Sequence, residues 1–414
     1  MEKIYELFKK YAKMMASQDY PVGDAAMLML DTGKGVYSTK YGANLANLKP
    51  EDIEKLAIKA LPTSRDGMNA MVYSQTPYCQ KALRDARPFK PMLDDMAMII
   101  GKAAYIADGR DGNAKAGKSL KGALKKSTGC FVLRGVGSGS KGKGYTVTVG
   151  RNLYEAVVAM TVLEKSAEVL YLADQLGGAV FLNPMGVRRL HKKYKKSYSK
   201  AEQTAKTAEN TSGLIAAAPA AEAQSGEKSR EQVLREKLTD LGKKLVKTGL
   251  VQGTWGNLSV RLDGQYMLVT PSGLDYMRLT PADMVKVNIN NLKYEGKIKP
   301  TSEAGLHAEI YKNRSDIGAV VHTHSTYCST FAAAEKAMPV TDPQLQEVFG
   351  AEVPLAEYAG AGTGKLAKNV ANALGSNFGC IMSHHGMVAC GEDIEEAFDN
   401  CARLEEYAGK YLGK

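Results

Sequence analysis

The sequence predicts an α/β protein of two domains, each an α/β/α unit in which a mainly antiparallel central sheet is flanked by helices. Three observations lead to this fold class. The chain has 414 residues, more than one hydrophobic core usually organises. A stretch of small and polar residues divides the chain into halves. In the second half, short strand-like runs alternate with helical ones.

The dividing stretch lies at residues 201–229 and includes the run AAAPAAEAQS at Ala216–Ser225. Small and polar residues with a single proline are typical of a flexible linker. We therefore expect one domain over residues 1–200, a flexible linker over 201–229 and a second domain over 230–414.

The two halves repeat the same residues in the same order. Tyr78–Cys79, Gly129–Cys130 and Leu163–Glu164 recur 249, 250 and 241 residues later in the chain. Chance matches would not keep their order with so few insertions and deletions. The pattern predicts a tandem duplication of one domain.

Apolar spacing in the second half predicts its elements in turn. A helix is expected at 229–248, because its leucines recur at helical spacing and Gly249 then ends it. Thr280 followed by Pro281 marks a helical start. The other expected strands lie at 257–262, 266–270, 317–323 and 379–390, and the other expected helices at 302–312, 325–335, 364–375 and 393–411.

Composition places the chain among ordinary globular proteins, with 44% hydrophobic and 24% charged residues. No apolar run approaches the roughly 18–20 residues that span a bilayer. The six cysteines form no CxxC pair, and we expect them to be reduced, packing thiols of a cytoplasmic protein.

The charge is uneven, because residues 1–200 hold 33 Lys and Arg against 18 Asp and Glu. This surplus forms either a solvated basic face or a surface for an acidic or phosphorylated partner near Arg188–Lys196. No nucleic-acid motif accompanies it, so nucleic acid is not an expected partner.

Four of the six histidines stand in two clusters, each at the end of an apolar run. His322 and His324 are two residues apart on an expected strand, so their side chains point to one face. A third imidazole from the pair His384–His385 would complete a three-nitrogen site with an open position, the arrangement of catalytic zinc. Glu303 offers a nearby carboxylate.

With these motifs in place, residues 230–412 resemble the class II aldolase/adducin family, and in particular its fuculose-phosphate aldolases. The matching segments are Gln252–Val260, Thr270–Gly273, Lys299–Glu303, Val321–His324 and His384–Gly386. The resemblance implies a zinc-dependent aldehyde-lyase that cleaves a ketose or deoxyketose 1-phosphate to dihydroxyacetone phosphate and an aldehyde.

The resemblance also assigns residues. It implies one zinc ion per chain, or another divalent metal, bound by His322, His324 and His385. Glu303 would be a further ligand and the acid/base at C3 of the substrate. The implied phosphate-binding residues are Asn257, Ser272, Gly273, Thr301 and Ser302, whose amides and hydroxyls suit a phosphate dianion.

The second acid/base group stays open. The position at which fuculose-phosphate aldolases carry a tyrosine is Pro343 here, and we expect no counterpart of their C-terminal tyrosine tail. Asp342, Glu347 and Tyr358 are candidates, as are residues of a neighbouring subunit or of the first half.

The first half lacks the site. Tyr73 and Gln75 stand at the register of His322 and His324, and no residue corresponds to Glu303. We expect residues 1–200 to be a degenerate copy without metal ligands.

Alternative functions stay open within the resemblance: a sugar-phosphate 4-epimerase, a dehydratase or decarboxylase, or a non-catalytic adducin-like interaction protein. The epimerases typically have Asp at the place of Glu303. Members of the family form fourfold rings. We expect either a homodimer with pseudo-fourfold symmetry or a homotetramer, and no membrane association.

Overall fold

The computed structural model describes residues 1–17, 26–63, 67–85, 87–109, 114–134, 144–196, 228–251 and 255–414. The chain divides into two compact units, Met1–His191 and Lys192–Lys414. Most of the expected linker, residues 201–227, lies outside the described residues. No helix in the described part of the chain is long and apolar enough to cross a membrane.

The N-terminal unit contains a seven-stranded sheet of order β3-β2-β1-β4-β7-β6-β5, in which only the β5–β6 pair is parallel. Its strands are β1 (Met27–Asp31), β2 (Val36–Thr39), β3 (Ile53–Lys55), β4 (Ala70–Ser74), β5 (Tyr105–Gly109), β6 (Gly129–Arg134) and β7 (Gly144–Gly150). Its named α-helices are α1 (Glu2–Ala16), α2 (Pro77–Arg84), α3 (Asp94–Ile99), α4 (Ala114–Leu124) and α5 (Leu153–Ala173).

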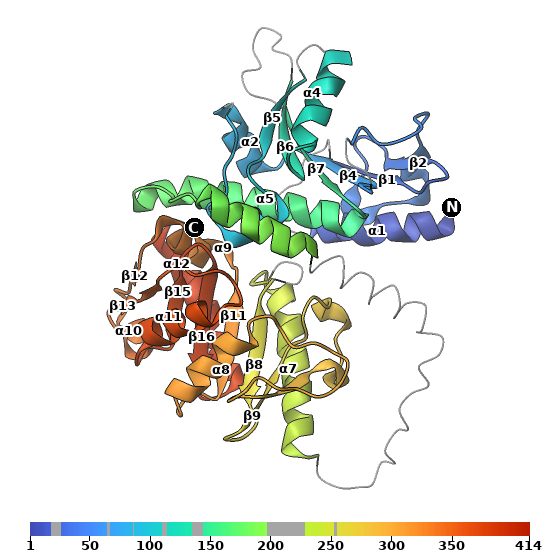
Figure 1. The fold of residues 1–414 in the computed structure, drawn as a ribbon. Helices are drawn as coiled ribbons and strands as arrows, with labels where there is room; N and C mark the ends of the chain where they lie inside the picture. The colour runs from blue at the N-terminus through green and yellow to red at the C-terminus, as the bar shows by residue number, and fades with distance from the viewer. Residues whose placement is uncertain are drawn as a thin grey trace. The chain divides into compact units, whose positions relative to one another are not determined.

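Helices cover both faces of this sheet (Figure 1). The apolar side of α1, formed by Phe8, Ala12 and Met15, packs with α5 against β1 and β4. The other face of the sheet packs against α4. A sheet whose two faces alternate along each strand can bury both of them only in such a layered arrangement.

The C-terminal unit contains a second seven-stranded sheet, of order β10-β9-β8-β11-β16-β15-β14, in which only the β14–β15 pair is parallel. Its strands are β8 (Asn257–Arg261), β9 (Tyr266–Val269), β10 (Val285–Asn288), β11 (Ala319–Thr323), β14 (Leu355–Ala356), β15 (Gly379–Met382) and β16 (Gly386–Gly391). A separate ribbon pairs β12 (Met338–Pro339) with β13 (Glu352–Val353).

Helices flank the second sheet on both faces as well (Figure 1). The unit's α-helices are α7 (Arg230–Lys247), α8 (Ala304–Asn313), α9 (Thr326–Ala334), α10 (Pro343–Phe349), α11 (Gly364–Leu374) and α12 (Ile394–Tyr411). The buried side chains of α8 and α11 form one core with β9, β10, β11, β15 and β16. On the other face, α12 and α9 pack against β16 and α7 packs against β8. The fold class is therefore the expected one.

The two sheets have the same strand order, but several connections differ, and one of them bears on the site. Between β10 and β11 the chain forms α8, which follows Glu303 directly. The described residues between β3 and β4 contain no helix. The described part of the N-terminal unit therefore has no counterpart of the element that holds the carboxylate in the C-terminal unit.

The sequence-based prediction of one strand over 379–390 was wrong. The segment is a hairpin of β15 and β16, joined by a turn at Ser383–His385. His384 takes a left-handed backbone conformation there, with φ of 58°. The turn escaped prediction because it contains no Gly or Asn at the left-handed position, which are the usual signals.

A carboxylate from α12 caps the helix that follows the histidine strand. Glu405 accepts hydrogen bonds from Ser325 Oγ at 2.6 Å, from the Tyr327 backbone N–H at 2.7 Å and from the Cys328 backbone N–H at 2.9 Å. Glu164 accepts from Tyr78 N–H and Cys79 N–H in the same way in the N-terminal unit. These amides belong to the first turns of α9 and α2, whose N–H groups have no partner within the helix.

We predict that Glu405→Ala destabilises the C-terminal unit by about 1–3 kcal/mol, because three donors lose their shared acceptor. The measurement is denaturant unfolding of the full chain followed by the fluorescence of Trp255, the only tryptophan, which lies in this unit. The control is Glu406→Ala, which removes an exposed carboxylate paired with Lys410. Equal unfolding midpoints for the two variants would contradict the capping role.

Candidate metal centre

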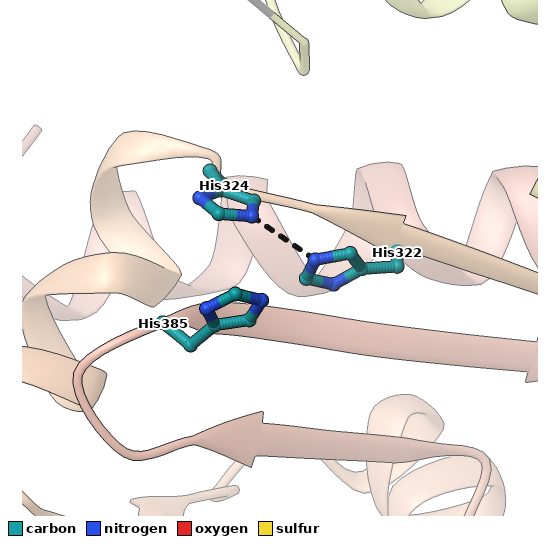
Figure 2. Close-up of side chains that lie close together, drawn as sticks. All are labelled: His322, His324 and His385. Atoms are coloured by element: carbon teal, nitrogen blue, oxygen red, sulfur yellow. Dashed lines mark hydrogen bonds between the residues drawn. The ribbon is translucent and has the colours of Figure 1, made fainter. Parts of the chain in front are cut away.

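Three histidines converge at the ends of two inner strands of the C-terminal sheet. His322 lies near the end of β11, His324 follows that strand, and His385 lies in the turn before β16 (Figure 2). All three side chains are buried. Their ligand nitrogens all lie within 4.8 Å of one another, the only group of three or more His, Cys, Asp or Glu ligands of this kind in the described part of the chain.

Ring geometry places the three imidazoles around a common centre. The His322 Nε2 and His324 Nε2 atoms are 3.0 Å apart (Figure 2). The rings of His322 and His385 are parallel, with centroids 5.0 Å apart, and the His324 and His385 centroids are 4.5 Å apart. The sequence predicted that one member of the His384–His385 pair would lie with His322 and His324. In the structure that member is His385.

The backbone brings His385 to this place by a close approach of two strands. A Cβ atom at Gly386 would collide with the Thr323 carbonyl oxygen and the His324 Cα atom, so only glycine fits. The turn is closed by a hydrogen bond from His385 N–H to the Met382 carbonyl at 2.9 Å. The glycine of the His-His-Gly motif therefore serves packing, since it lets the turn lie against the end of β11.

Glu303 completes the cluster as the N-cap residue of α8. Its Oε1 lies 3.0 Å from His385 Nε2, and its Oε2 lies 3.2 Å from His322 Nε2. Burial alone would raise the pKa of Glu303, but the charges and hydrogen bonds of His322 and His385 outweigh burial and hold the pKa well below its usual range. The carboxyl group is therefore ionised.

The hydrogen bonding of this cluster fits a bound cation. His322 Nδ1 lies 2.7 Å from the Met387 carbonyl oxygen, which can only accept, so Nδ1 carries the proton. The Nε2 atom then faces a carboxylate oxygen and another imidazole nitrogen. Positive charge between these groups stabilises them, and a protonated imidazole or a divalent ion with nitrogen and oxygen ligands can supply it.

Two loops with exposed hydroxyl and amide groups lie beside Glu303. The loop after β9 and the loop before α8 are joined by hydrogen bonds from Ser272 N–H to the Lys299 carbonyl and from Thr301 N–H to the Thr270 carbonyl, both at 3.0 Å. Ser272, Gly273 and Ser302 are exposed, whereas Thr301 is buried. Four of the five expected phosphate-binding residues are thereby brought together, next to a helix N-terminus.

The fifth, Asn257, is buried and already bonded. Its side-chain Nδ2 donates to Glu303 Oε2 at 3.0 Å, and its Oδ1 accepts from His307 Nε2. An amide nitrogen has two hydrogens, so one remains available for a second acceptor. The residue is therefore in contact with the carboxylate, a contact that its place in the sequence did not suggest.

The candidates for a second acid/base group lie in different surroundings. Asp342 caps α10 by accepting from Gln344 N–H and Leu345 N–H. Glu347 is exposed on the same helix. The Tyr358 ring packs edge-on against His384, with centroids 5.1 Å apart, so it contacts the turn that holds His385.

The N-terminal sheet has other side chains at the corresponding ladder positions. Tyr73 pairs with Met27 and Val147 across its neighbouring strands, as His322 pairs with Asn257 and Val388. Gln75, the counterpart of His324, donates to the Gly144 carbonyl. In the sequence, residues 133–135 stand at the register of His384–His385, and of these residue 135 lies outside the described residues.

Comparison with known proteins agrees with the C-terminal location of the site. Residues 236–412 match the family described as Class II Aldolase and Adducin N-terminal domain. L-fuculose phosphate aldolase of Escherichia coli (strain K12) is 36% identical over 180 residues, 43% of this chain and 82% of that protein. A 5-methylthioribulose-1-phosphate/5-deoxyribulose-1-phosphate aldolase of Rhodospirillum rubrum is 35% identical over 178 residues, 43% of this chain and 80% of that protein.

A solved structure of an L-fuculose 1-phosphate aldolase is 35% identical, with a TM-score of 0.42, and the match covers 43% of this chain and 84% of that one.

The only tryptophan gives the cluster a spectroscopic reporter. The Trp255 ring lies against His324, with centroids 5.6 Å apart. We predict that one equivalent of Co²⁺, a paramagnetic quencher, lowers the Trp255 emission in a saturable way, and that prior addition of Zn²⁺ prevents it. His385→Ala should abolish the response. Quenching that rises without saturation and persists in His385→Ala would exclude a metal ion at this cluster.

Proposed function

The chain belongs to the class II aldolase and adducin family, and from this premise we propose that its C-terminal unit is a metal-dependent aldolase of ketose 1-phosphates. The proposed reaction cleaves the C3–C4 bond of a ketose or deoxyketose 1-phosphate and yields dihydroxyacetone phosphate and an aldehyde. The observation that supports it most is the placement of an ionised Glu303 between three buried imidazoles and two hydroxyl-bearing loops.

We assign the metal to His322, His324 and His385, with Glu303 as a further ligand in the resting site. Zinc is the expected ion, because three imidazoles and one carboxylate suit its four-coordinate geometry. When bound, a divalent ion supplies Lewis-acid stabilisation of the negative charge that develops on the substrate's keto oxygen. All remaining steps use groups of the chain itself.

Glu303 moves the proton at C3. In the direction of condensation its ionised carboxylate takes a proton from C3 of dihydroxyacetone phosphate, which then forms the C–C bond with the aldehyde. In the direction of cleavage the electron pair of the C3–C4 bond passes to C3, and the same carboxyl group, after taking up a proton from solvent, delivers that proton to C3. The hydroxyl proton at C4 leaves to a second base, and among the three candidates Tyr358 is favoured by its contact with His384.

Substrate orientation is assigned to the two loops beside α8. The hydroxyls and backbone N–H groups of Ser272, Gly273, Thr301 and Ser302 would hold the phosphate group, assisted by the free hydrogen of the Asn257 amide. Relatives named for fuculose phosphate and for 5-methylthioribulose or 5-deoxyribulose 1-phosphate suggest the sugar class.

We also propose that the N-terminal unit is a degenerate copy of the same domain. The identical strand order, the matching ladder partners of Tyr73 and His322, and the helix caps of Glu164 and Glu405 support a tandem duplication. With no counterpart of α8 among its described residues, this unit would add no second site, and each chain would hold one metal ion.

A chain with two such domains can replace two subunits of a fourfold ring. We propose a homodimer with pseudo-fourfold symmetry and two working sites, in which the basic first half furnishes cations to a substrate phosphate across a subunit boundary; a homotetramer is the alternative. Light scattering of the active protein tests this assembly. A stable, fully active monomer would contradict both forms.

We predict that the purified protein contains about one zinc ion per chain and releases dihydroxyacetone phosphate from a deoxyketose 1-phosphate. The assay couples release of the triose phosphate to its reduction, and chromatography identifies the aldehyde. Zinc together with a 4-epimer and no triose phosphate would replace the aldolase proposal by an epimerase. An absence of both metal and turnover would support a non-catalytic role.

A second prediction separates the ligand histidine from its neighbour in the turn. His385→Ala should lose zinc and lower kcat by at least about 1,000-fold, since the ion contributes several kcal/mol of charge stabilisation. His384→Asn is the matched control, because Asn tolerates the left-handed backbone at this position. It should keep about one zinc per chain. Loss of zinc in His384→Asn alone would reverse the assignment.

A further inference from the structure

A row of buried polar side chains leads from Glu303 into the core of the C-terminal unit. It passes through Asn257 and Ser259 on β8 and through His307 and Tyr311 on α8. All of these side chains are at most 5% exposed. None of the hydroxyl or imidazole groups in the row has a part in the mechanism proposed above.

Hydrogen bonds connect the row without a gap. Tyr311 OH lies 2.7 Å from Ser259 Oγ, which lies 2.6 Å from His307 Nδ1. His307 Nε2 lies 2.5 Å from Asn257 Oδ1, and Asn257 Nδ2 donates to Glu303 Oε2 at 3.0 Å.

With a neutral His307 ring, only one proton arrangement satisfies every member. The carboxylate oxygen accepts, so Asn257 presents its N–H₂ group to Glu303 and its oxygen to His307. His307 must then donate from Nε2 and accept at Nδ1, where Ser259 donates, and Ser259 in turn accepts from Tyr311. Every donor points toward Glu303. Burial and the charge of His322 lower the pKa of His307 to about 3, against the opposing effect of Glu303, so the ring is neutral.

The row forms because the spacing of side chains along the strand β8 matches their spacing along the helix α8. Asn257 and Ser259 are two residues apart on a strand, a rise of roughly 6.6–6.8 Å on one face. Glu303, His307 and Tyr311 are four residues apart on a helix, a rise of about 6 Å per step on one side. A strand and a helix packed along each other therefore alternate their polar side chains in a single line.

The far end of the row is fixed to the scaffold. Arg261 donates from Nη2 to the Tyr311 carbonyl at 2.9 Å, and its guanidinium lies 4.6 Å from the centroid of the Tyr311 ring. The same guanidinium group also donates to the Ile317 and Arg314 carbonyls. Tyr311 is thus held by the connection that leads into β11, the strand that carries His322.

The N-terminal unit provides an internal comparison. By ladder position, Met27 and Met29 of β1 stand where Asn257 and Ser259 stand in β8. The described part of this unit also has no counterpart of α8. The unit that lacks the carboxylate therefore lacks the row as well, although the strands themselves are kept.

We propose that Tyr311, Ser259 and His307 are positioning residues that act through the Asn257 amide to fix the direction of the Glu303 carboxylate toward the three imidazoles and C3 of the substrate. This inference rests on the function proposed above. Loss of the row leaves substrate binding and folding largely intact and lowers kcat, because Glu303 can rotate away from its working direction.

The first test examines the proton of His307 and needs no substrate. In metal-free protein labelled with ¹⁵N-histidine, we expect a ring N–H resonance assigned to Nε2 of His307, protected from solvent exchange, with Nδ1 unprotonated. Its assignment comes from its loss in His307→Asn. Ser259→Ala should shift it. An imidazolium ring, or a proton on Nδ1, would overturn the proposal even if the protein is an active aldolase.

The second test uses two amides in place of the imidazole. In His307→Gln the side-chain amide nitrogen lies near the position of the His307 Nε2 atom and can donate to Asn257. In His307→Asn the amide nitrogen lies near the position of Nδ1 and cannot reach Asn257 as a donor. His307→Asn should lower kcat about 10–100-fold with KM changed by less than about threefold and with zinc content unchanged. His307→Gln should recover at least about tenfold of that loss.

Ser259→Ala and Tyr311→Phe extend the comparison if a His307 variant folds poorly. Ser259→Ala should resemble His307→Asn, and Tyr311→Phe should have a smaller effect because Ser259 can still donate to His307. Thr239→Val is the control for loss of a buried hydroxyl, since Thr239 bonds only within α7. Equal kcat values for His307→Gln and His307→Asn would overturn the positioning role. So would kcat losses that only parallel the loss of zinc or the fall in Tm of each variant.

Discussion

A buried carboxylate facing imidazole nitrogens at 3.0 and 3.2 Å governs the structure around it. An ionised group without a partner in the interior costs several kcal/mol, so Glu303 must be compensated on every side. The imidazoles and the cation that they can hold provide this on one side, and the Asn257 amide provides it on the other. The Met387 carbonyl sets the His322 tautomer, and Gly386 admits the turn that carries His385. Each of these features helps to place the Glu303 carboxylate and the imidazole nitrogens around the same point.

The two units show how such a site depends on one connection. Both sheets have the same strand order. In both units a carboxylate from the helix after the last strand, α5 or α12, caps the helix that follows the central strand. One difference is the segment between the third and fourth strands in chain order of each unit, where the C-terminal unit forms α8 and the described residues of the N-terminal unit form no helix. This helix presents Glu303 at its start and His307 and Tyr311 along one side. Without it, histidines on the neighbouring strand would have no carboxylate to face, and the N-terminal unit has Tyr73 and Gln75 there instead.

The sequence predicted the structure well where residues of one chemical kind recur at the spacing of a strand or a helix. The two-residue spacing of His322 and His324 predicted a shared face, and apolar spacing predicted α7, α9, α11 and α12 to within a few residues. The hairpin at 379–391 was missed because His384 supplies the left-handed turn residue without a glycine signal. The roles of Ser259 and Tyr311 were missed for another reason. A serine in a strand and a tyrosine in a helix have no distinctive pattern until the packing of β8 along α8 is known, although the spacing of Glu303, His307 and Tyr311 was visible in the sequence.

The central claim is that one divalent ion is bound by three imidazoles and the Glu303 carboxylate, and X-ray absorption spectroscopy of the zinc-loaded protein tests it most directly. The account predicts three nitrogen scatterers with the outer-shell pattern of imidazole at about 2.0–2.1 Å, together with oxygen and no sulfur. In Glu303→Gln the imidazole contribution should stay while the oxygen shell changes. A sulfur shell at about 2.3 Å, or fewer than three imidazoles, would contradict the account, because the buried cysteines would then be ligands and the histidine cluster would not be the metal site.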